Sequence, residues 1–311
     1  MLAKTLNGQF EIFVGIDQTG ASLRGGVEAR PLPVAVVEKV GDGAWLVTHD
    51  PSGRPLRLAA FAPEEVERVL RESRGAKSSL GRHVAILADC VFGLPAATWP
   101  AKHAGNRGLW ELFAHAAAHE GGYGLKPAAA YFANILARAG EQPERYPVRE
   151  CERLSGANSV FRTHPFQKNI QCGTYRIWRD LGRTRGQWLN FRYFTPEREA
   201  RSNKPWVFEA YPSLIWRELL MQRTRNLSEL GRALKANAPE VAIDEASLAH
   251  IERDADAADA AVLAVGGYLL QKKRLLFADA PRKDEGKEGW IVGLSRPNQS
   301  KVTSSGATSS R

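Results

Sequence analysis

A short apolar run near the N-terminus, FEIFVGID at positions 10–17, constrains the fold more than any other stretch of the chain. It consists mainly of aromatic and β-branched residues, ends in an acid, and is followed by the Gly-rich segment QTGASLRGG. A run of this length and composition, bounded by turn residues, is typical of a buried strand. We therefore expect an interior strand of a sheet here, with Asp17 at its carboxyl end.

Further segments predict a mixed α/β architecture. Strands are expected at 32–40 and 44–50, joined by a Gly-Asp-Gly hairpin signal, and again at 83–95 and 206–212. Helical spacing predicts a helix over 62–73, helices between about 96 and 205, and one long final helix. That last helix is expected to run through Leu248, Ile251, Ala255, Ala258 and Val262.

These elements predict a single domain over residues 1–295, with a helical insertion at about 96–205 between the fourth and fifth strands. The tail 296–311 is rich in Ser, Thr and Gly and has no apolar periodicity, so it is expected to be disordered.

The composition narrows the class of protein. No run of 18 or more apolar residues occurs, so a membrane span is not expected. Cys90, Cys151 and Cys172 have no paired spacing, and no signal-peptide pattern precedes the first strand, which together indicate a cytoplasmic protein. The net charge of +9 is compatible with a nucleic-acid partner and also with simple solubility. The oligomeric state stays open.

Carboxylates stand near the ends of three predicted strands and on the final helix. Asp17 and Asp89 end the first and fourth strands, and Glu209 lies in the fifth. Asp256 and Asp259 are three residues apart and would share one helix face. Clustered carboxylates repel one another without a cation, and oxygen ligands favour Mg²⁺ or Mn²⁺. The four aspartates therefore predict a metal centre suited to two-metal hydrolysis of phosphodiesters, with Glu209 as a further catalytic candidate.

Structural roles are the alternative for each acid. The strand-end acids would then satisfy turn amides, Glu209 would pair with an arginine, and Asp254 would be a solvated charge on the helix surface. Glu152 and Arg153 are expected to be surface or packing charges.

Several motifs carry a family resemblance. They are VGIDQTGASLRGG, ILADCVFGLP, RECERLSGANSVF, VFEAYPS, DADAADAAVLA and EGWI, spread over residues 11–291. In this order they resemble family 429 of the domains of unknown function, whose members are described as predicted RNase H-like nucleases. The DAADA piece is also similar to the last-helix motif of RuvC-type Holliday-junction resolvases. The resemblance implies an RNase H-like mixed sheet flanked by helices, and an acidic site formed by Asp17, Asp89, Asp256 and Asp259.

A basic, aromatic-rich segment at 161–205 is the candidate substrate surface. Arginines for phosphates and aromatic rings for stacked bases favour nucleic-acid binding, whereas the alternative is that the rings are core and the arginines solvated. The substrate-binding candidates are Arg162, Lys168, Arg183, Arg185 and Arg192. The expected function is Mg²⁺-dependent cleavage of DNA or RNA. Its rivals are a phosphotransfer protein of the sugar-kinase or actin type, suggested by GIDQTGAS, and a non-catalytic nucleic-acid scaffold.

Overall fold

The first strand, β1 (Ile12–Ile16), lies inside a mixed eight-stranded sheet. The strand order is β6-β7-β5-β1-β2-β3-β8, and the short β4 pairs with β2 off this path. In the computed structural model, residues 10–18, 29–74, 80, 83–98, 105–139, 146–162, 170–184, 188–195, 200, 204–221, 225–277 and 288–294 are described. The other strands are β2 (Leu32–Val40), β3 (Gly43–Val47), β4 (Arg57–Leu58), β5 (Val84–Ala88), β6 (Asn190–Phe191), β7 (Trp206–Glu209) and β8 (Val241–Ile243).

Strand direction divides the sheet into two halves. β1, β2 and β3 pair antiparallel in sequence order, and the expected Gly-bounded hairpin joins β2 to β3. β5 and β7 run parallel to β1 and to each other, and β6 and β8 add parallel edges. Because β1, β5 and β7 point the same way, their carboxyl ends meet at one edge of the sheet.

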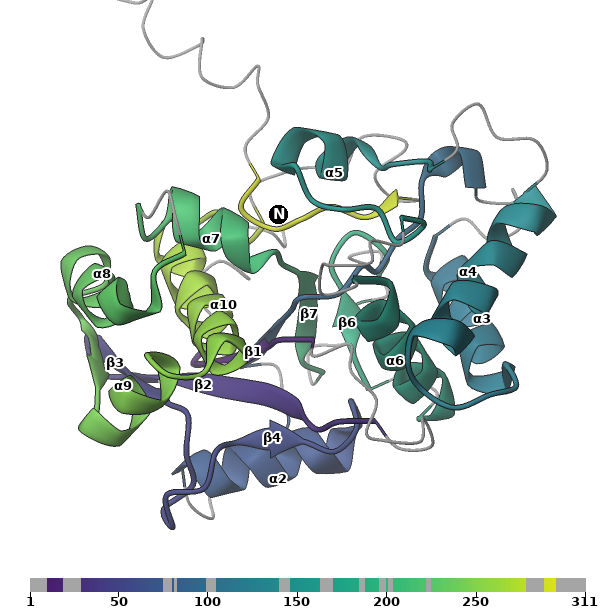
Figure 1. Ribbon diagram of the computed structural model, residues 1–311. Coiled ribbons are helices and arrows are strands. Elements are labelled where there is room, and N and C mark those ends of the chain that lie inside the picture. The colour runs from purple at the N-terminus through teal and green to yellow at the C-terminus, as the bar shows by residue number, and fades with distance from the viewer. Residues whose placement is uncertain are drawn as a thin grey trace, which may run out of the picture.

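Helices cover both faces of the sheet, which explains why β1 and β5 are buried along their whole length. Side chains alternate between the faces. Val14 and Ile86 pack with α2 (Pro63–Arg74), α3 (Gly105–Ala118), α4 (Leu125–Ala139) and α6 (Ile170–Arg183). Phe13 and Leu87 pack on the other side with α7 (Pro212–Glu218), α8 (Leu230–Asn237), α9 (Glu245–Ile251) and α10 (Ala255–Lys272). Figure 1 shows the two helical groups on opposite sides of the strands.

The last helix, α10, is a core element. Its residues from Ala257 to Gln271 are buried, which is typical of a helix that is apolar all round. The helix crosses directly over β1: a Cβ atom at Gly15 would lie 2.0 Å from the carbonyl oxygen of Ala260. Only glycine at this position permits the close approach, which holds the start of α10 beside the end of β1.

The expectation of one long final helix is wrong. The chain breaks it at 252–254, between α9 and α10. Asp254 caps α10, because its carboxylate accepts hydrogen bonds from the backbone amides of Asp256 and Ala257. Apolar spacing continued across the break, but an aspartate of this kind favours the N-cap over a helix interior.

The chain between β5 and β7 has the expected helical character and adds two features. A 3₁₀ turn, η1 (Ala96–Thr98), α3, α4, the short α5 (Glu150–Ser155) and α6 follow in order. β6 then joins the sheet beside β7, so this region also extends the sheet. A second 3₁₀ turn, η3 (Leu227–Glu229), precedes α8. The tail 296–311, expected to be disordered, lies outside the described residues.

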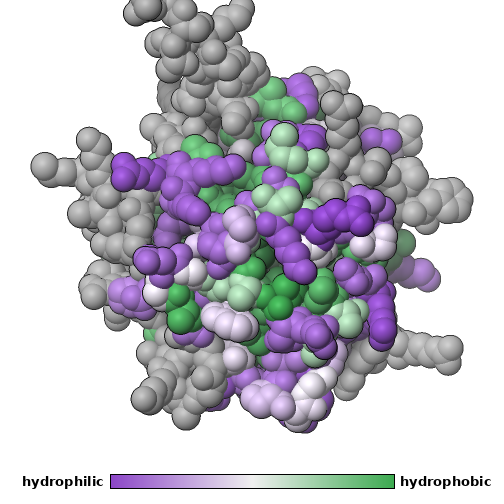
Figure 2. Space-filling model, turned by 90° about the vertical axis from the view of Figure 1, so that its left-hand side faces the viewer, coloured by the Kyte–Doolittle hydropathy of each residue, from purple (hydrophilic) through white to green (hydrophobic). Residues whose placement is uncertain are grey.

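The mixed α/β class predicted from the sequence is confirmed at the level of a sheet flanked by helices. Among the described residues, no helix combines the length and apolar character that a membrane crossing requires. On the face shown in Figure 2, hydrophobic residues near the centre are surrounded by hydrophilic ones.

Candidate active site: an acidic cavity at the strand ends

Three acids occupy the shared edge of β1, β5 and β7. Ile16 pairs with Ala88, and Ala88 pairs with Glu209. Asp17 and Asp89 each come one residue after these strand ends, and adjacent strands lie about 4.8 Å apart. The register therefore places the first two carboxylates side by side at the centre of the edge.

A cavity of about 370 Å³ opens at this edge. Its lining draws on each of the motif segments that carry the family resemblance, although they lie far apart in the sequence. The lining residues are Asp17, Gln18, Asp89, Cys90, Val91, Arg149, Ala157, Asn158, Ile170, Glu209, Ala210, Tyr211, Pro212, Ser213, Arg225, Asp259 and Ile291. Four of the five predicted site acids are among them.

Asp17 and Asp89 form the centre of the cavity. A hydrogen bond links their side chains, and Gln18 also bonds to Asp89. Burial raises the pKa of Asp89 to about 7, and the nearby charge of Asp259 adds to this effect. Two carboxylates in such contact share a proton more readily than they both ionise. At neutral pH this pair is therefore poised between sharing a proton and giving it up to a cation.

Asp259 reaches the cavity from α10 and already has a counter-charge. Its Oδ2 atom lies 2.6 Å from a guanidinium nitrogen of Arg225, and its Oδ1 atom accepts a hydrogen bond from Trp216. The ion pair and the indole N–H satisfy a carboxylate that is only 6% exposed.

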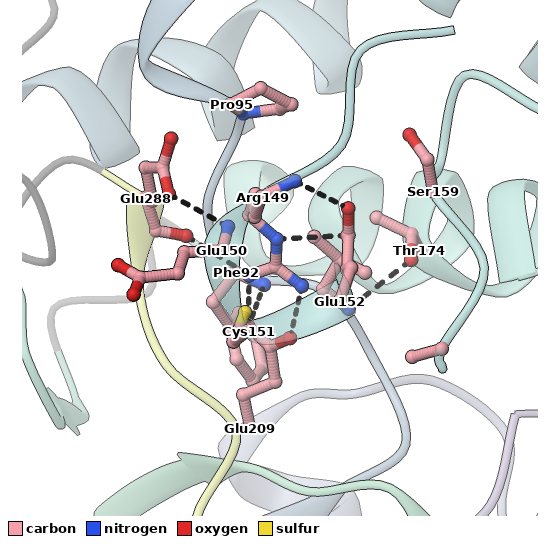
Figure 3. Close-up of polar contacts among 12 residues, drawn as sticks. Phe92, Pro95, Arg149, Glu150, Cys151, Glu152, Ser159, Thr174, Glu209 and Glu288 are labelled. Atoms are coloured by element: carbon pink, nitrogen blue, oxygen red, sulfur yellow. Dashed lines mark hydrogen bonds and ion pairs between the residues drawn. The ribbon is translucent and has the colours of Figure 1, made fainter. Parts of the chain in front are cut away.

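Glu209 is the partner of a buried arginine, Arg149 (Figure 3). Both guanidinium Nη atoms donate to the Glu209 carboxylate, whose Oε2 also accepts from the backbone amide of Phe92. The Nε atom donates to Glu152 at 2.8 Å, and Nη1 reaches the Glu288 carbonyl oxygen at 3.0 Å. Arg149 thus joins the end of β7, the start of α5 and the segment at 288–294.

The buried charges of Arg149 and Glu152 shift each other's pKa values. Burial alone would lower the pKa of Arg149, but the anionic groups around it, Glu152 and Glu209 among them, raise it well above its usual value. Burial raises the pKa of Glu152, and Arg149 opposes that effect. The expectation that Glu152 is a surface or packing charge is corrected, since it is an ionic partner and only 2% exposed.

Strand alternation explains why Glu209 pairs away from the aspartates. Phe208 faces the α10 side of the sheet, so Glu209, like Val207, faces the α3 and α6 side. Ile16 faces that same α3 and α6 side. Asp17 is the next residue, so it points to the opposite face, toward α10. Of the roles considered for Glu209, pairing with an arginine is the one observed.

Asp256 does not join the other acids. It lies in the first turn of α10, half-buried, and is not among the described residues that line the cavity. Asp254, expected to be a solvated charge, is the N-cap and also lies 3.4 Å from Arg57. The predicted aspartate pair of α10 therefore contributes one member, Asp259, to the cavity.

The aromatic residues of the 161–205 segment are largely core. Phe161, Tyr175, Trp178, Phe191 and Phe194 are buried, so these rings are not available for base stacking and the alternative interpretation holds for them. The arginines differ. Arg162 and Arg183 are exposed, Arg183 donating to the Tyr123 hydroxyl, and Arg192 lies 4.3 Å from the Tyr193 ring centroid. Lys168 and Arg185 lie outside the described residues.

The fit of a metal ion to this cavity is partial. Within the described part of the chain, no group of three or more His, Cys, Asp or Glu side chains is placed to hold one. Two of the cavity acids are already paired with arginines, Glu209 with Arg149 and Asp259 with Arg225. Asp17, Asp89 and Asp259 all line the cavity, and carboxylate oxygens are ligands that Mg²⁺ accepts. Gln18 also lines it, but its Oε1 atom is buried against Gly173 of α6.

Sequence reasoning missed Arg149, Arg225 and Gln18 as site residues. Arg149 and Gln18 stand inside the motif segments, so position in a motif was an available signal for them. Arg225 lies in no motif, and no sequence signal points to it. Comparisons with known proteins find no family model, no curated protein and no solved structure that matches this chain.

Proposed function

We propose that this chain is an RNase H-like, Mg²⁺- or Mn²⁺-dependent nuclease that hydrolyses phosphodiester bonds in DNA or RNA. The observation that carries the proposal is the meeting of Asp17, Asp89 and Asp259 in one cavity at the carboxyl ends of parallel strands. Active sites of open α/β sheets lie at this edge. The antiparallel order β3-β2-β1, continued by parallel β5 and β7, supports the RNase H-like plan that the motifs resemble.

Asp17 and Asp89 would hold the cation. Their shared hydrogen bond and the raised pKa of Asp89 describe two carboxylates held close together, whose mutual repulsion on ionisation a divalent ion would offset. When bound, such an ion polarises a phosphoryl oxygen and activates water. Asp259 would contribute once it is released from Arg225. Glu209, neutralised by Arg149, would act by positioning the strand end rather than as a ligand.

The test is cleavage of labelled single- and double-stranded DNA and RNA with Mg²⁺ or Mn²⁺. Asp17→Asn is expected to reduce cleavage at least a hundredfold while leaving the circular dichroism spectrum unchanged, because it removes a ligand charge and keeps the shape. Asp42→Asn, an exposed acid in the β2–β3 turn, is the matched control and should retain full activity. Cleavage by Asp17→Asn at the wild-type rate would overturn the proposal, and binding without cleavage by the wild type would favour the scaffold alternative.

A further inference from the structure

We propose that Arg225 is the substrate-phosphate ligand of the cavity, held on Asp259 until a divalent cation takes that carboxylate. The inference rests on the proposed function, since it requires both the cation and the phosphodiester.

Among the described residues, two arginines line the cavity, Arg149 and Arg225, and Arg225 is the more open to a ligand. Arg149 is 1% exposed and its guanidinium bonds to Glu152, Glu209 and the Glu288 carbonyl oxygen. It has no capacity to reach into the cavity. The side chain of Arg225 is 36% exposed, so it is the cation of the described lining that a phosphate can meet from solvent.

The contacts of Arg225 leave part of its guanidinium unused. Both contacts come from Nη2, one to Asp259 Oδ2 at 2.6 Å and one to the Ala255 carbonyl oxygen at 2.6 Å. The Nε and Nη1 atoms have no partner among the described residues. A guanidinium binds phosphate through two parallel N–H donors, and Arg225 keeps the donors for such a contact.

Cation and guanidinium compete for the same carboxylate. Trp216 donates to Asp259 Oδ1, and Arg225 holds Oδ2, so both oxygens are engaged. A divalent ion that binds Asp259 must take a position now held by a positive group, and the two positive charges repel. Arg225 therefore leaves Asp259 as the ion binds, and rotation of its long side chain keeps the guanidinium at the cavity, where the negative charge of a phosphodiester attracts it.

The experiment compares Arg225→Gln with wild type and with Arg217→Gln. Arg217, whose side chain is 46% exposed, pairs with Glu218 and is not part of the described cavity lining, so its variant controls for the loss of one positive charge. Calorimetry measures Mn²⁺ binding to the metal-free proteins. Fluorescence anisotropy measures binding of a labelled six-nucleotide single strand with Ca²⁺ present. Circular dichroism checks the fold of each variant.

Arg225→Gln is expected to bind Mn²⁺ about fivefold more tightly, because the competitor for Asp259 is gone. It should bind the oligonucleotide about tenfold more weakly, because a charge-assisted contact is lost. Arg225→Lys, which keeps the charge without the fork, should bind Mn²⁺ as wild type does and bind the oligonucleotide with intermediate affinity. Arg217→Gln should match wild type in both measurements.

If Arg225→Gln loses affinity for both Mn²⁺ and the oligonucleotide, or changes in neither, the proposed role of Arg225 is wrong. Neither outcome contradicts the proposed metal site of the wild-type protein. Absence of Mn²⁺ binding to the wild type would instead refute the proposed function, and this inference with it. The wild-type and variant arms therefore separate the two failures.

Discussion

Replacing Asp89 by asparagine is expected to stabilise the metal-free protein at alkaline pH. Asn has nearly the shape of a protonated Asp, and its amide retains partners in Asp17 and Gln18, which hydrogen-bond the native side chain. The substitution removes an acid whose ionised form is disfavoured first by burial and next by the charge of Asp259. Asp89, which is proposed to bind the cation, would thus lower the stability of the cation-free protein. Such a cost is expected where a functional site conflicts with folding.

The size of the effect follows from the pKa of Asp89, which is about 7 in the folded protein against an ordinary value of 3.8. Below about pH 4 the carboxyl is protonated in both states. Between pH 4 and 7 the unfolded chain releases the proton while the folded protein keeps it, so the free energy of unfolding falls as the pH rises. Above pH 7 the loss is complete. Each pKa unit corresponds to about 1.4 kcal/mol, which gives about 2–3 kcal/mol between pH 5 and pH 8.

Urea unfolding at pH 5 and pH 8, with EDTA present, measures this difference in wild type, Asp89→Asn and the control Asp42→Asn. The free energy of unfolding of Asp89→Asn should lack this fall of about 2–3 kcal/mol between pH 5 and pH 8. The other titrating groups change the stability of all three proteins equally, so they cancel in the comparison. The control should follow wild type. If Asp89→Asn shows the same pH dependence as wild type, or is the less stable protein at pH 8, the proposed charge state of the cavity is wrong.

Two further substitutions test the framework around the cavity. Arg149→Met should lower the free energy of unfolding by about 3–5 kcal/mol, because it leaves Glu152 and Glu209 buried without their cation. Urea denaturation measures this loss in the single variant and in the double variant that also carries Glu209→Gln. A double variant no more stable than the single variant would argue against the ionic link. Gly15→Ala places a Cβ atom 2.0 Å from the Ala260 carbonyl oxygen, so α10 must move. We expect the free energy of unfolding to fall by about 1–3 kcal/mol and the affinity for Mn²⁺ to fall with it. An unchanged melting temperature would contradict the close packing of α10 on β1.

Strand positions were predictable because the local signal was strong. The run that ends at Asp17 is apolar on both faces, which only a strand covered on both sides needs, and the structure covers it so. The same reasoning placed Asp89 at the end of a strand and Glu209 within the fifth strand, whose last residue it is in the structure. Their roles depend on what the neighbouring elements bring, and the sequence carries no local signal for that. Glu209 meets Arg149 across 60 residues of sequence.

The final helix shows a different limit to what the sequence can predict, namely where a helix begins. Asp254 and Asp256 are two residues apart, yet one caps α10 and the other lies in its first turn. Apolar periodicity is continuous across that point, so the helix boundary depends on capping by a single carboxylate. Once the helix begins at Ala255, its phase carries Asp259 to the cavity and leaves Asp256 out of the described lining.

The basic segment shows that composition does not fix exposure. Aromatic residues interleaved with arginine suggested a stacking surface, but α6 packs against α3 and buries Tyr175 and Trp178. Close packing of these helices requires Gly182, where a Cβ atom would lie 2.0 Å from the Phe113 carbonyl oxygen. The rings therefore build the layer that covers the sheet.

In crystals of this protein soaked in Mn²⁺, anomalous difference density would locate the cation. We expect a peak inside the cavity, within coordination distance of carboxylate oxygens of both Asp17 and Asp89, and no such peak in crystals of Asp17→Asn. Crystals in which Mn²⁺ binds elsewhere, or in which the two carboxylates stay hydrogen-bonded to each other at saturating Mn²⁺, would contradict the proposed metal site.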